Sequence, residues 1–173
     1  MNFFNRITKE ELTPKILTLK EPIKAVGFSV KTSNKSISND ATEVGKKFSD
    51  FKKSNMIKNR KDPWAFVAVS KNYDENSGIW DYFIGDVVTD FNNISEDLTT
   101  IEIPAIKYAI FPIRPRFKFA WGIVLGQMKR YIYEKWLPGS KYEPAEIIDD
   151  FEYHDERSIR KKEPEIDLYI GVK

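Results

Sequence analysis

The segment 165–172 alternates acidic or aromatic residues with aliphatic ones. Glu165, Asp167 and Tyr169 occupy one set of positions, and Ile166, Leu168, Ile170 and Val172 occupy the other. Because successive side chains of a β-strand point to opposite faces, the pattern predicts a strand whose aliphatic face packs on a helix. The other face then presents two carboxylates and a tyrosine. Such a face suits an organic cation, since aromatic rings supply cation–π attraction and the acid supplies the counter-charge.

A similar acidic and aromatic pattern occurs 86 residues earlier in the chain. Asp81-Tyr82-Phe83-Ile84-Gly85 is echoed by Asp167-Leu168-Tyr169-Ile170-Gly171. We therefore expect Asp81 and Asp167 to occupy equivalent positions in two repeats, with Phe83 at the position equivalent to Tyr169. In that arrangement the two acidic faces approach one another across a pseudo-twofold axis. A solvated face of an ordinary sheet gives the same alternation, so the pattern alone leaves both interpretations open.

A second echo extends the repeat to whole structural units. Segment 23–30 resembles segment 106–113, and each half of the chain has the pattern strand, helix, strand, strand. The expected strands are 15–30, 65–69, 80–88, 101–113, 147–154 and 165–172. Two such units predict an α+β fold with antiparallel sheets, a pseudo-twofold axis and a central ligand cleft. The whole chain, 1–173, is then one domain with pseudo-repeats at about 15–90 and 100–173.

Two helices are expected to pack against these strands. The first begins at Asp40, because Asp40 and Glu43 have the spacing of a capping box. The second covers 119–136, where apolar residues recur at helical spacing and Pro138-Gly139 ends the pattern. Most of that apolar stripe is expected to be core, and its first turn, with Trp121, can open onto the cleft.

The residue types give little support for a metal site, a catalytic triad or a phosphate-binding loop. His154 is the only histidine and there is no cysteine, so neither a zinc site nor a Ser-His-Asp triad is expected. His154 is interpreted as a surface residue. The 8 glycines form no phosphate-binding loop. We therefore expect no metal and no cofactor.

Charge and hydropathy limit the partners. The chain has 28 Lys and Arg against 26 Asp and Glu, a net charge of +2 that provides no basic footprint for direct nucleic-acid binding. No apolar run approaches the roughly 20 residues of a membrane helix, and the N-terminus does not resemble a secretory signal. With no cysteine, a cytoplasmic location is expected.

Several motifs of the second half occur together in a known family. They are Ile103-Pro104-Ala105-Ile106-Lys107-Tyr108-Ala109-Ile110-Phe111, Ala120-Trp121-Gly122, Trp136-Leu137-Pro138-Gly139-Ser140-Lys141-Tyr142, Phe151-Glu152-Tyr153 and the closing segment from Glu165 to Lys173. With these motifs the chain resembles the gyrase-inhibitor-like small-molecule-binding domains, also found as effector domains of AraC-type and MerR-type multidrug regulators. The resemblance covers 100–173 closely and the first half by its plan. Two positions depart from it, since Asp167 stands where the family usually has glutamate and Gly171 where it usually has proline.

The resemblance implies two tandem strand-helix-strand-strand units with a ligand cleft at their junction. It favours a stand-alone module that binds a hydrophobic, cationic small molecule and does not itself bind DNA or a membrane. The residues expected to bind the ligand are Glu165, Asp167, Tyr169, Asp81, Phe83, Tyr108, Phe111, Trp121 and Tyr153. The shorter side chain of Asp167 leaves open whether Asp167 or Glu165 reaches the ligand.

Two other functions stay open at this point. Some members of the superfamily hydrolyse electrophilic small molecules with a carboxylate and a hydroxyl donor. In this chain Glu165 or Asp167 would be the base and Tyr108 or Tyr153 the donor. The family name also implies an inhibitory protein-interaction module. A binder returns the compound intact, whereas an enzyme returns a product.

Overall fold

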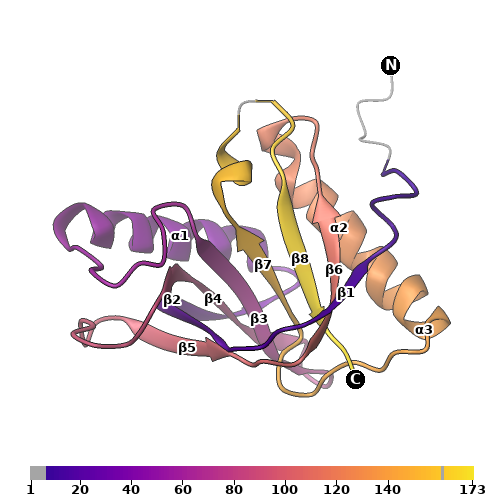
Figure 1. Cartoon of the computed structure of the whole chain (residues 1–173), viewed down its shortest axis with the longest axis horizontal. Coiled ribbons are helices and arrows are strands. Elements are labelled where there is room, and N and C mark those ends of the chain that lie inside the picture. The colour runs from indigo at the N-terminus through magenta and orange to yellow at the C-terminus, as the bar shows by residue number, and fades with distance from the viewer. Residues whose placement is uncertain (1–6, 161) are drawn as a thin grey trace.

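The computed structural model describes residues 7–160 and 162–173, which form one antiparallel sheet with helices against it (Figure 1). The strands are β1 (Lys15–Thr18), β2 (Ile23–Ser33), β3 (Phe66–Asp74), β4 (Ile79–Val88), β5 (Thr99–Ile103), β6 (Lys107–Ile113), β7 (Asp150–His154) and β8 (Ile166–Gly171). Their order across the sheet is β1-β6-β8-β7-β3-β4-β2-β5, and every neighbouring pair is antiparallel. The fold is therefore of the mixed α+β class expected from the sequence.

The strand order is symmetric about the β7–β3 pair in the middle of the sheet. β1 and β5 form the two edges, β6 and β2 lie next to them, and β8 and β4 connect these to the central pair. In each half the chain forms a strand, then a helix, then two further strands. The second half thus repeats the element order of the first.

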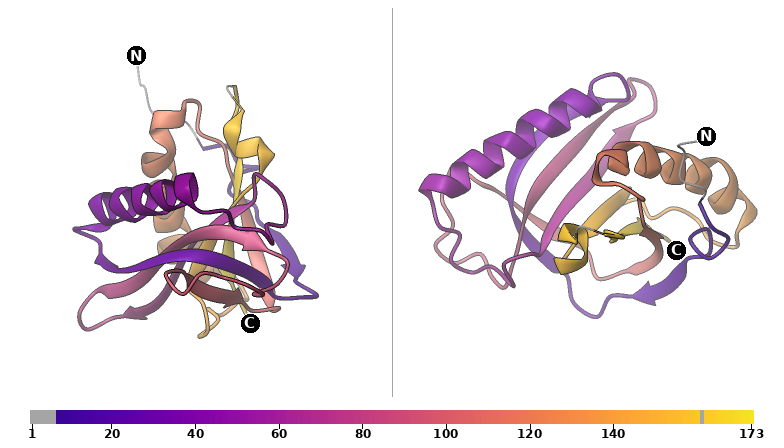
Figure 2. Two further views of the ribbon diagram at one scale, coloured as in Figure 1. Left: turned by 90° about the vertical axis from the view of Figure 1, so that its left-hand side faces the viewer. Right: turned by 90° about the horizontal axis from the view of Figure 1, so that it is seen from above.

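Two helical segments cover the same face of the sheet (Figure 2). The first is α1 (Ile37–Ser54), which packs on β2 and β4. The second is continuous through η1 (Lys118–Ala120), α2 (Trp121–Tyr131), the π-helical turn η2 (Ile132–Trp136) and α3 (Leu137–Gly139), and it packs on β6 and β8. A 3₁₀ turn, η3 (Glu156–Ile159), follows β7.

Three clusters of buried side chains form the core. One lies between α1 and the sheet and includes Phe28 and Phe48. The second lies between α2 and the sheet and includes Met128 and Leu168. The third lies on the opposite face and contains no helical residue; its members include Ala25, Val67, Val69, Phe83, Val87, Ile103, Tyr108, Ile110 and Phe151. The sheet is strongly twisted, since β2 and β5 run across the direction of β6 and β8 in Figure 1.

Two of the expected strands are each divided into two. The segment 15–30 forms β1 and β2, which lie on opposite sides of the sheet, and at the turn between them the Leu19 N–H donates to the Ile106 carbonyl oxygen (3.0 Å). The segment 101–113 is divided at Pro104 into β5 and β6. Proline has no N–H to donate to a sheet, so the strand ends there and the chain crosses from one half to the other.

The first helix begins three residues earlier than expected, at Ile37. No side-chain capping bond is made at its start. Asp40 instead accepts a hydrogen bond from the Thr32 hydroxyl (2.6 Å), which lowers the pKa of that carboxyl. The spacing of Asp40 and Glu43 was therefore the wrong indicator of the helix start. The second helix ends close to the expected position, with Pro138 and Gly139 inside its last turn.

The strand registers show that the two sequence echoes are not in step. Gly27 pairs with Gly85, whereas its echo Ile110 pairs with Tyr169 and not with Gly171. Gly27 and Gly85 also face one another so closely that a Cβ on Gly27 would overlap the Ile84 carbonyl oxygen. If Ile110 corresponds to Gly27, the counterpart of Asp81 is Glu165. The expected equivalence of Asp81 and Asp167 therefore conflicts with the other echo by two residues.

Candidate ligand-binding site

The acidic residues of β8 face away from the helices, as the alternation predicts, but arginine side chains of this chain already bind them. Arg157 contacts Asp167 through Nη2 (2.6 Å) and Glu165 through Nη1 (2.7 Å). Glu165 also accepts a hydrogen bond from Nε of Arg114 (2.8 Å). Hydrogen bonds from Arg157 to Asp155 and Asp167 raise the pKa of the guanidinium, although burial lowers it. The place proposed for an organic cation thus contains a permanent cation of the protein.

Asp81 lies far from Asp167. The strands β7 and β3 separate them, and Asp81 lies four residues beyond the β4 residue, Gly85, that is in line with Asp167. With about 4.8 Å per strand and about 3.3 Å per residue, the two carboxylates are about 20 Å apart along the sheet. Asp81 binds Asn72 (2.7 Å) and Lys31 (3.1 Å), and the Asn72 hydrogen bond is the main cause of its lowered pKa. The two acidic faces do not meet.

Four of the expected aromatic residues do share the face of Asp167. Tyr169, Tyr108, Tyr153 and Phe83 belong to, or pack against, the cluster that contains no helix. Phe151, which sequence analysis did not select, lies between them: its ring stacks on Tyr169 at 4.4 Å and meets Tyr108 edge-on at 5.4 Å. Burial raises the pKa of Tyr108, whose hydroxyl donates to the Pro104 carbonyl oxygen (2.8 Å). These rings pack on one another as core.

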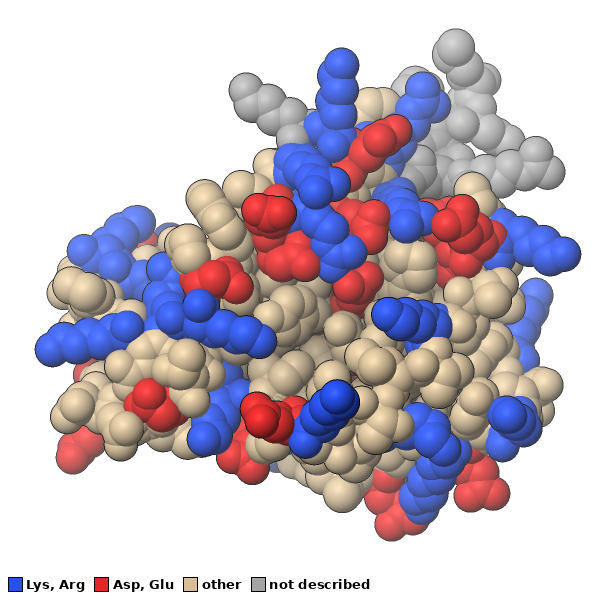
Figure 3. All heavy atoms as spheres, in the orientation of Figure 1, with Lys and Arg blue, Asp and Glu red and all other residues tan. Residues whose placement is uncertain are grey.

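Figure 3, which shows the molecule in the orientation of Figure 1, presents acidic and basic side chains intermingled over the surface. No broad region of a single charge is visible on this face. The intermingling agrees with the near balance of basic and acidic residues in the sequence.

Phe111 and Trp121 lie on the other side of the sheet, with the helices. Phe111 is fully buried under the second helical segment and meets the ring of Trp136 edge-on at 5.1 Å. Trp121 begins α2, and its ring lies 6.3 Å from the imidazole of His154. The expected ligand residues are therefore divided between two faces of one sheet.

The helix side of β3 and β7 forms a distinct part of the molecule, which we call the central strip. Its residues are Phe66, Ala68 and Ser70 from β3 and Asp150, Glu152 and His154 from β7. The main helix packing is on the outer strands, with α1 on β2 and β4 and the second segment on β6 and β8. Ala68 and Glu152 pair at the middle of the β3–β7 register. The strip thus runs along the symmetric centre of the sheet, between the two helices.

Asp150 is the more deeply buried acid of the strip, with only 6% of its side chain exposed. Lys129 of α2 approaches it to 2.8 Å, and the Tyr133 hydroxyl donates to its Oδ2 (3.0 Å). Burial lowers the pKa of Lys129, but the charges of Asp150 and Glu152 outweigh burial and raise it on balance. Lys129 is therefore an ammonium ion held against the acids of the strip.

Glu152 lies at the centre of the strip with 13% of its side chain exposed. Its Oε2 is 3.3 Å from Nε2 of His154, whose ring stacks on Phe66 at 4.0 Å. Burial raises the pKa of Glu152, but the His154 contact and the charge of Lys129 outweigh burial and lower it on balance. The carboxylate is thus ionised in a mostly buried place, beside the His154 ring that stacks on Phe66.

Tyr82 of β4 lies on the same side of the sheet as the strip. Burial raises its pKa above the usual value, and the charges of Glu152 and Asp150 raise it further. The phenol therefore stays protonated and can donate a hydrogen bond. Trp121, Phe66, Tyr82 and Tyr133 together give the strip an aromatic surround.

The sequence analysis missed most of this constellation. His154 was interpreted as a surface residue, but its side chain is only 15% exposed, and its ring stacks on Phe66 with the tilted ring of Trp121 nearby. The available signal was the alternation Asp150-Phe151-Glu152-Tyr153-His154, which places two acids and a histidine on one face. Glu152 also belongs to one of the motifs that carry the family resemblance.

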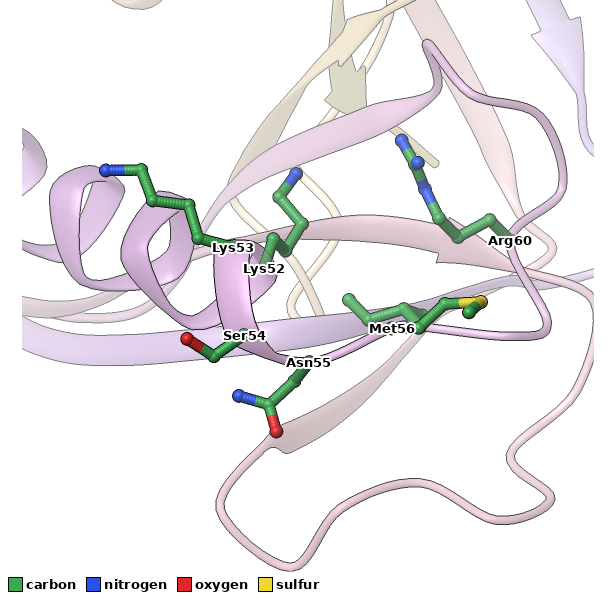
Figure 4. A pocket seen from close by; sticks show the side chains of 7 residues that line it. Lys52, Lys53, Ser54, Asn55, Met56 and Arg60 are labelled. Carbon is green, nitrogen blue, oxygen red and sulfur yellow. The ribbon is translucent and has the colours of Figure 1, made fainter.

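A separate hollow of about 310 Å³ lies at the C-terminal end of α1 (Figure 4). Its lining residues are Lys52, Lys53, Ser54, Asn55, Met56, Ile57 and Arg60. Lys52 and Arg60 both bind the buried carboxylate of Asp86, at 2.9 and 2.8 Å. None of the residues expected to bind ligand lines this hollow, and its two main cations serve an internal ion pair.

Within 7–160 and 162–173, no three His, Asp or Glu side chains are grouped so that they could hold a metal ion. In the same part of the chain, no helix is both long and apolar enough to cross a membrane.

The chain matches a known family over nearly all of its length. The model of the Cass2 family, described as integron-associated effector binding protein, matches residues 16–172. No curated protein sequence matches the chain significantly. Several solved structures also resemble it, including the three that follow.

The integron cassette protein VCH_CASS2 of Vibrio cholerae has 16% identity, 93% and 96% coverage of the two chains, and a TM-score of 0.62. SAV2435, solved bound to tetraphenylphosphonium, has 15% identity, 92% and 93% coverage, and a TM-score of 0.65. A transcription regulation protein of Staphylococcus aureus has 13% identity, 92% and 97% coverage, and a TM-score of 0.60. At these identities the three structures establish a shared fold.

Proposed function

We propose that this chain, which belongs to the Cass2 family of integron-associated effector-binding proteins, binds a hydrophobic organic cation at the central strip. The fold is one that small-molecule-binding proteins use. In this proposal Glu152 supplies the counter-charge, and the rings of Trp121, Phe66 and Tyr82 supply apolar contact.

The observation that carries the proposal is the environment of Glu152. It is an ionised carboxylate, 13% exposed, whose hydrogen-bond partner is the imidazole of His154. Glu165 and Asp167 are instead bound by arginine guanidinium groups at 2.6–2.8 Å. A cationic ligand would have to break those charge-assisted bonds, which are among the stronger ones in proteins. Glu152 therefore has more to gain from an added cation.

A structural relative gives independent support for the ligand class. SAV2435 was solved with tetraphenylphosphonium, a cation covered by four aromatic rings. Buried carboxylates surrounded by rings suit such a ligand, because its charge is delocalised and weakly hydrated. We propose the same chemical class for this chain, without assigning the same compound.

The hydrolase interpretation gains no specific support from the geometry. Its carboxylates, Glu165 and Asp167, are bound by Arg157, and its donor Tyr108 already donates to the Pro104 carbonyl oxygen. Tyr153, the other donor considered, packs near Tyr169 at 6.3 Å between ring centroids. The binding function is therefore preferred over catalysis.

The test is calorimetric titration of tetraphenylphosphonium into wild type and two variants with a carboxylate replaced by an amide. We expect Glu152→Gln to weaken binding at least about tenfold, which corresponds to about 1.4 kcal/mol. Asp167→Asn should leave the affinity nearly unchanged, because its charge is already compensated by Arg157. The exposed Glu134→Gln serves as the control for a change of net charge. The reverse pattern, with Asp167→Asn weakened and Glu152→Gln intact, would place the site on the opposite face.

A further inference from the structure

We infer that Lys129 is a tethered cation that competes with the ligand and so sets the cation affinity of the central strip. The inference rests on the proposed function, and it concerns which residue of the chain limits that function. Lys129 would keep weakly binding cations out, and only a ligand with extensive aromatic contact would overcome it.

The first observation behind this inference is the position of Lys129. It comes from the last turn of α2 and reaches over β7, so that Nζ lies 2.8 Å from Oδ1 of Asp150. Its neighbour Met128 is buried under the helix, which anchors the backbone that presents the lysine. Tyr133, one turn later, donates to the same carboxylate. Two residues of one helix are thus directed at one acid.

The second observation is the net charge of the groups near Glu152. Asp150 and Glu152 of the strip and Lys129 beside it contribute two carboxylates and one ammonium, a net charge of −1 from these three groups. Lys129 acts on both acids. Its charge helps to lower the pKa of Glu152, and its ammonium group forms an ion pair with Asp150. A monovalent cation that enters beside Glu152 therefore meets the field of an ammonium already present. Without Lys129 the same place would have a net charge of −2.

The consequence is a selectivity that depends on Lys129. Opposite or like charges within a few ångströms change charge-dependent equilibria by about one to three powers of ten in partly buried sites. Removal of Lys129 should strengthen the binding of cations and leave neutral analogues unaffected. Lys135, an exposed lysine one and a half turns further along, provides a matched change of net charge without contact to the strip.

The isosteric substitution Asp150→Asn tests the role of Lys129 in a second way. When Asp150 is replaced by Asn, Lys129 loses its ion-pair partner, and Glu152 and Asp149 remain as the acids whose charges act on it. Lys129 should then neutralise Glu152 more completely, and cation affinity should fall. The two substitutions therefore have opposite expected effects, although each breaks the same ion pair. Simple loss of packing or of stability would shift both in one direction.

The experiment measures the dissociation constants of tetraphenylphosphonium and of the neutral triphenylphosphine oxide at pH 7.5 and low salt. For Lys129→Met we expect binding of the cation about 10- to 100-fold tighter, with the neutral probe unchanged. For Asp150→Asn we expect weaker cation binding, and for Lys135→Met no change beyond about twofold. If Lys129→Met does not fold, the direction of the Asp150→Asn effect decides.

Unchanged or weaker cation binding in Lys129→Met overturns the inference, as does tighter binding in Asp150→Asn. Weaker binding in Lys129→Met would instead indicate that the side chain of Lys129 supports the site and does not compete with the ligand. Failure of the proposed function looks different, because Glu152→Gln would then bind the cation as well as wild type. If Glu152→Gln loses affinity while Lys129→Met does not change, only the role of Lys129 is wrong.

Discussion

At the scale of single residues, the partner of each carboxylate decides what that carboxylate can do. Glu165 and Asp167 alternate with aliphatic residues as a ligand site would, yet Arg157 binds both. Glu152 stands in a strand of mixed composition, yet it is the mostly buried acid whose hydrogen-bond partner is an imidazole. Arg157 and Asp167 are ten residues apart and meet only through the turn after β7. The charge state of a face therefore depends on contacts that its own strand does not contain.

The same contacts predict how stability changes in acid. The pKa of Asp81 is lowered mainly by its hydrogen bond with Asn72, and that of Asp155 is lowered because bonds from Arg157 outweigh burial. In Glu152, His154 and Lys129 outweigh burial in the same sense. A carboxyl whose folded pKa lies below its unfolded value stabilises the native state at pH above the unfolded value, near 4, and this contribution is lost as pH falls through the folded value.

We therefore expect the free energy of unfolding in urea to be level between pH 7 and 5 as far as these groups determine it, and to fall below about pH 4. Unfolding curves at pH 7, 5, 4 and 3 measure this directly. Replacing Asp155 with Asn should flatten the acid limb, since one of the three groups is removed. An equal or greater stability at pH 3 than at pH 5 would contradict the assigned ion pairs.

At the scale of elements, β8 connects the two faces. Its residues Ile166, Leu168 and Ile170 are buried in the cluster under α2, and the alternate residues face away. This division follows from the two-residue period of a strand, and the sequence pattern predicted it correctly. The aliphatic side holds the helix that presents Lys129 and Trp121 to the central strip.

Truncation of this side should therefore cost stability. For Leu168→Ala, which empties a fully buried position under α2, we expect a loss of about 2–5 kcal/mol in the free energy of unfolding. Leu17→Ala in the edge strand β1 is the matched control, because Leu17 is 38% exposed and should lose no more than about 1 kcal/mol. Urea unfolding of both variants gives the comparison, and similar losses would mean that β8 does not carry the α2 cluster.

Local sequence patterns predicted most helices and strands, whereas contacts between distant parts of the chain decided which side chains meet. The helix expected over 119–136, the strands expected over 65–69 and 80–88 and the inward face of β8 all follow from the spacing of apolar residues. The division of 15–30 was missed although Lys20-Glu21-Pro22 lies between β1 and β2, because the prediction did not use this proline as the sign of a strand end. Glu152 was overlooked because Lys129, whose charge acts on it, and Phe66, which stacks on its partner His154, come from other elements.

At the scale of the whole molecule, the two halves form one sheet with a symmetric strand order, and the central strip lies at its centre. The chain belongs to a family of effector-binding proteins, and its relative SAV2435 was solved with an aromatic cation. Each helix packs mainly on the outer strands of its own half, so the strip lies between them. At the proposed site a ligand would contact β3 of the first half and β7 of the second half at once.

The most direct test is the position of a bound cation. The ligand is tetraphenylarsonium, whose arsenic atom scatters X-rays anomalously. The anomalous signal in a crystal structure of the complex then locates the centre of the ligand directly. We predict an arsenic peak between α1 and α2, nearer to the carboxylate of Glu152 than to that of Asp167, with the phenyl groups against Trp121 and Phe66. A peak on the opposite face of the sheet, beside Tyr169 and Arg157, would contradict the account.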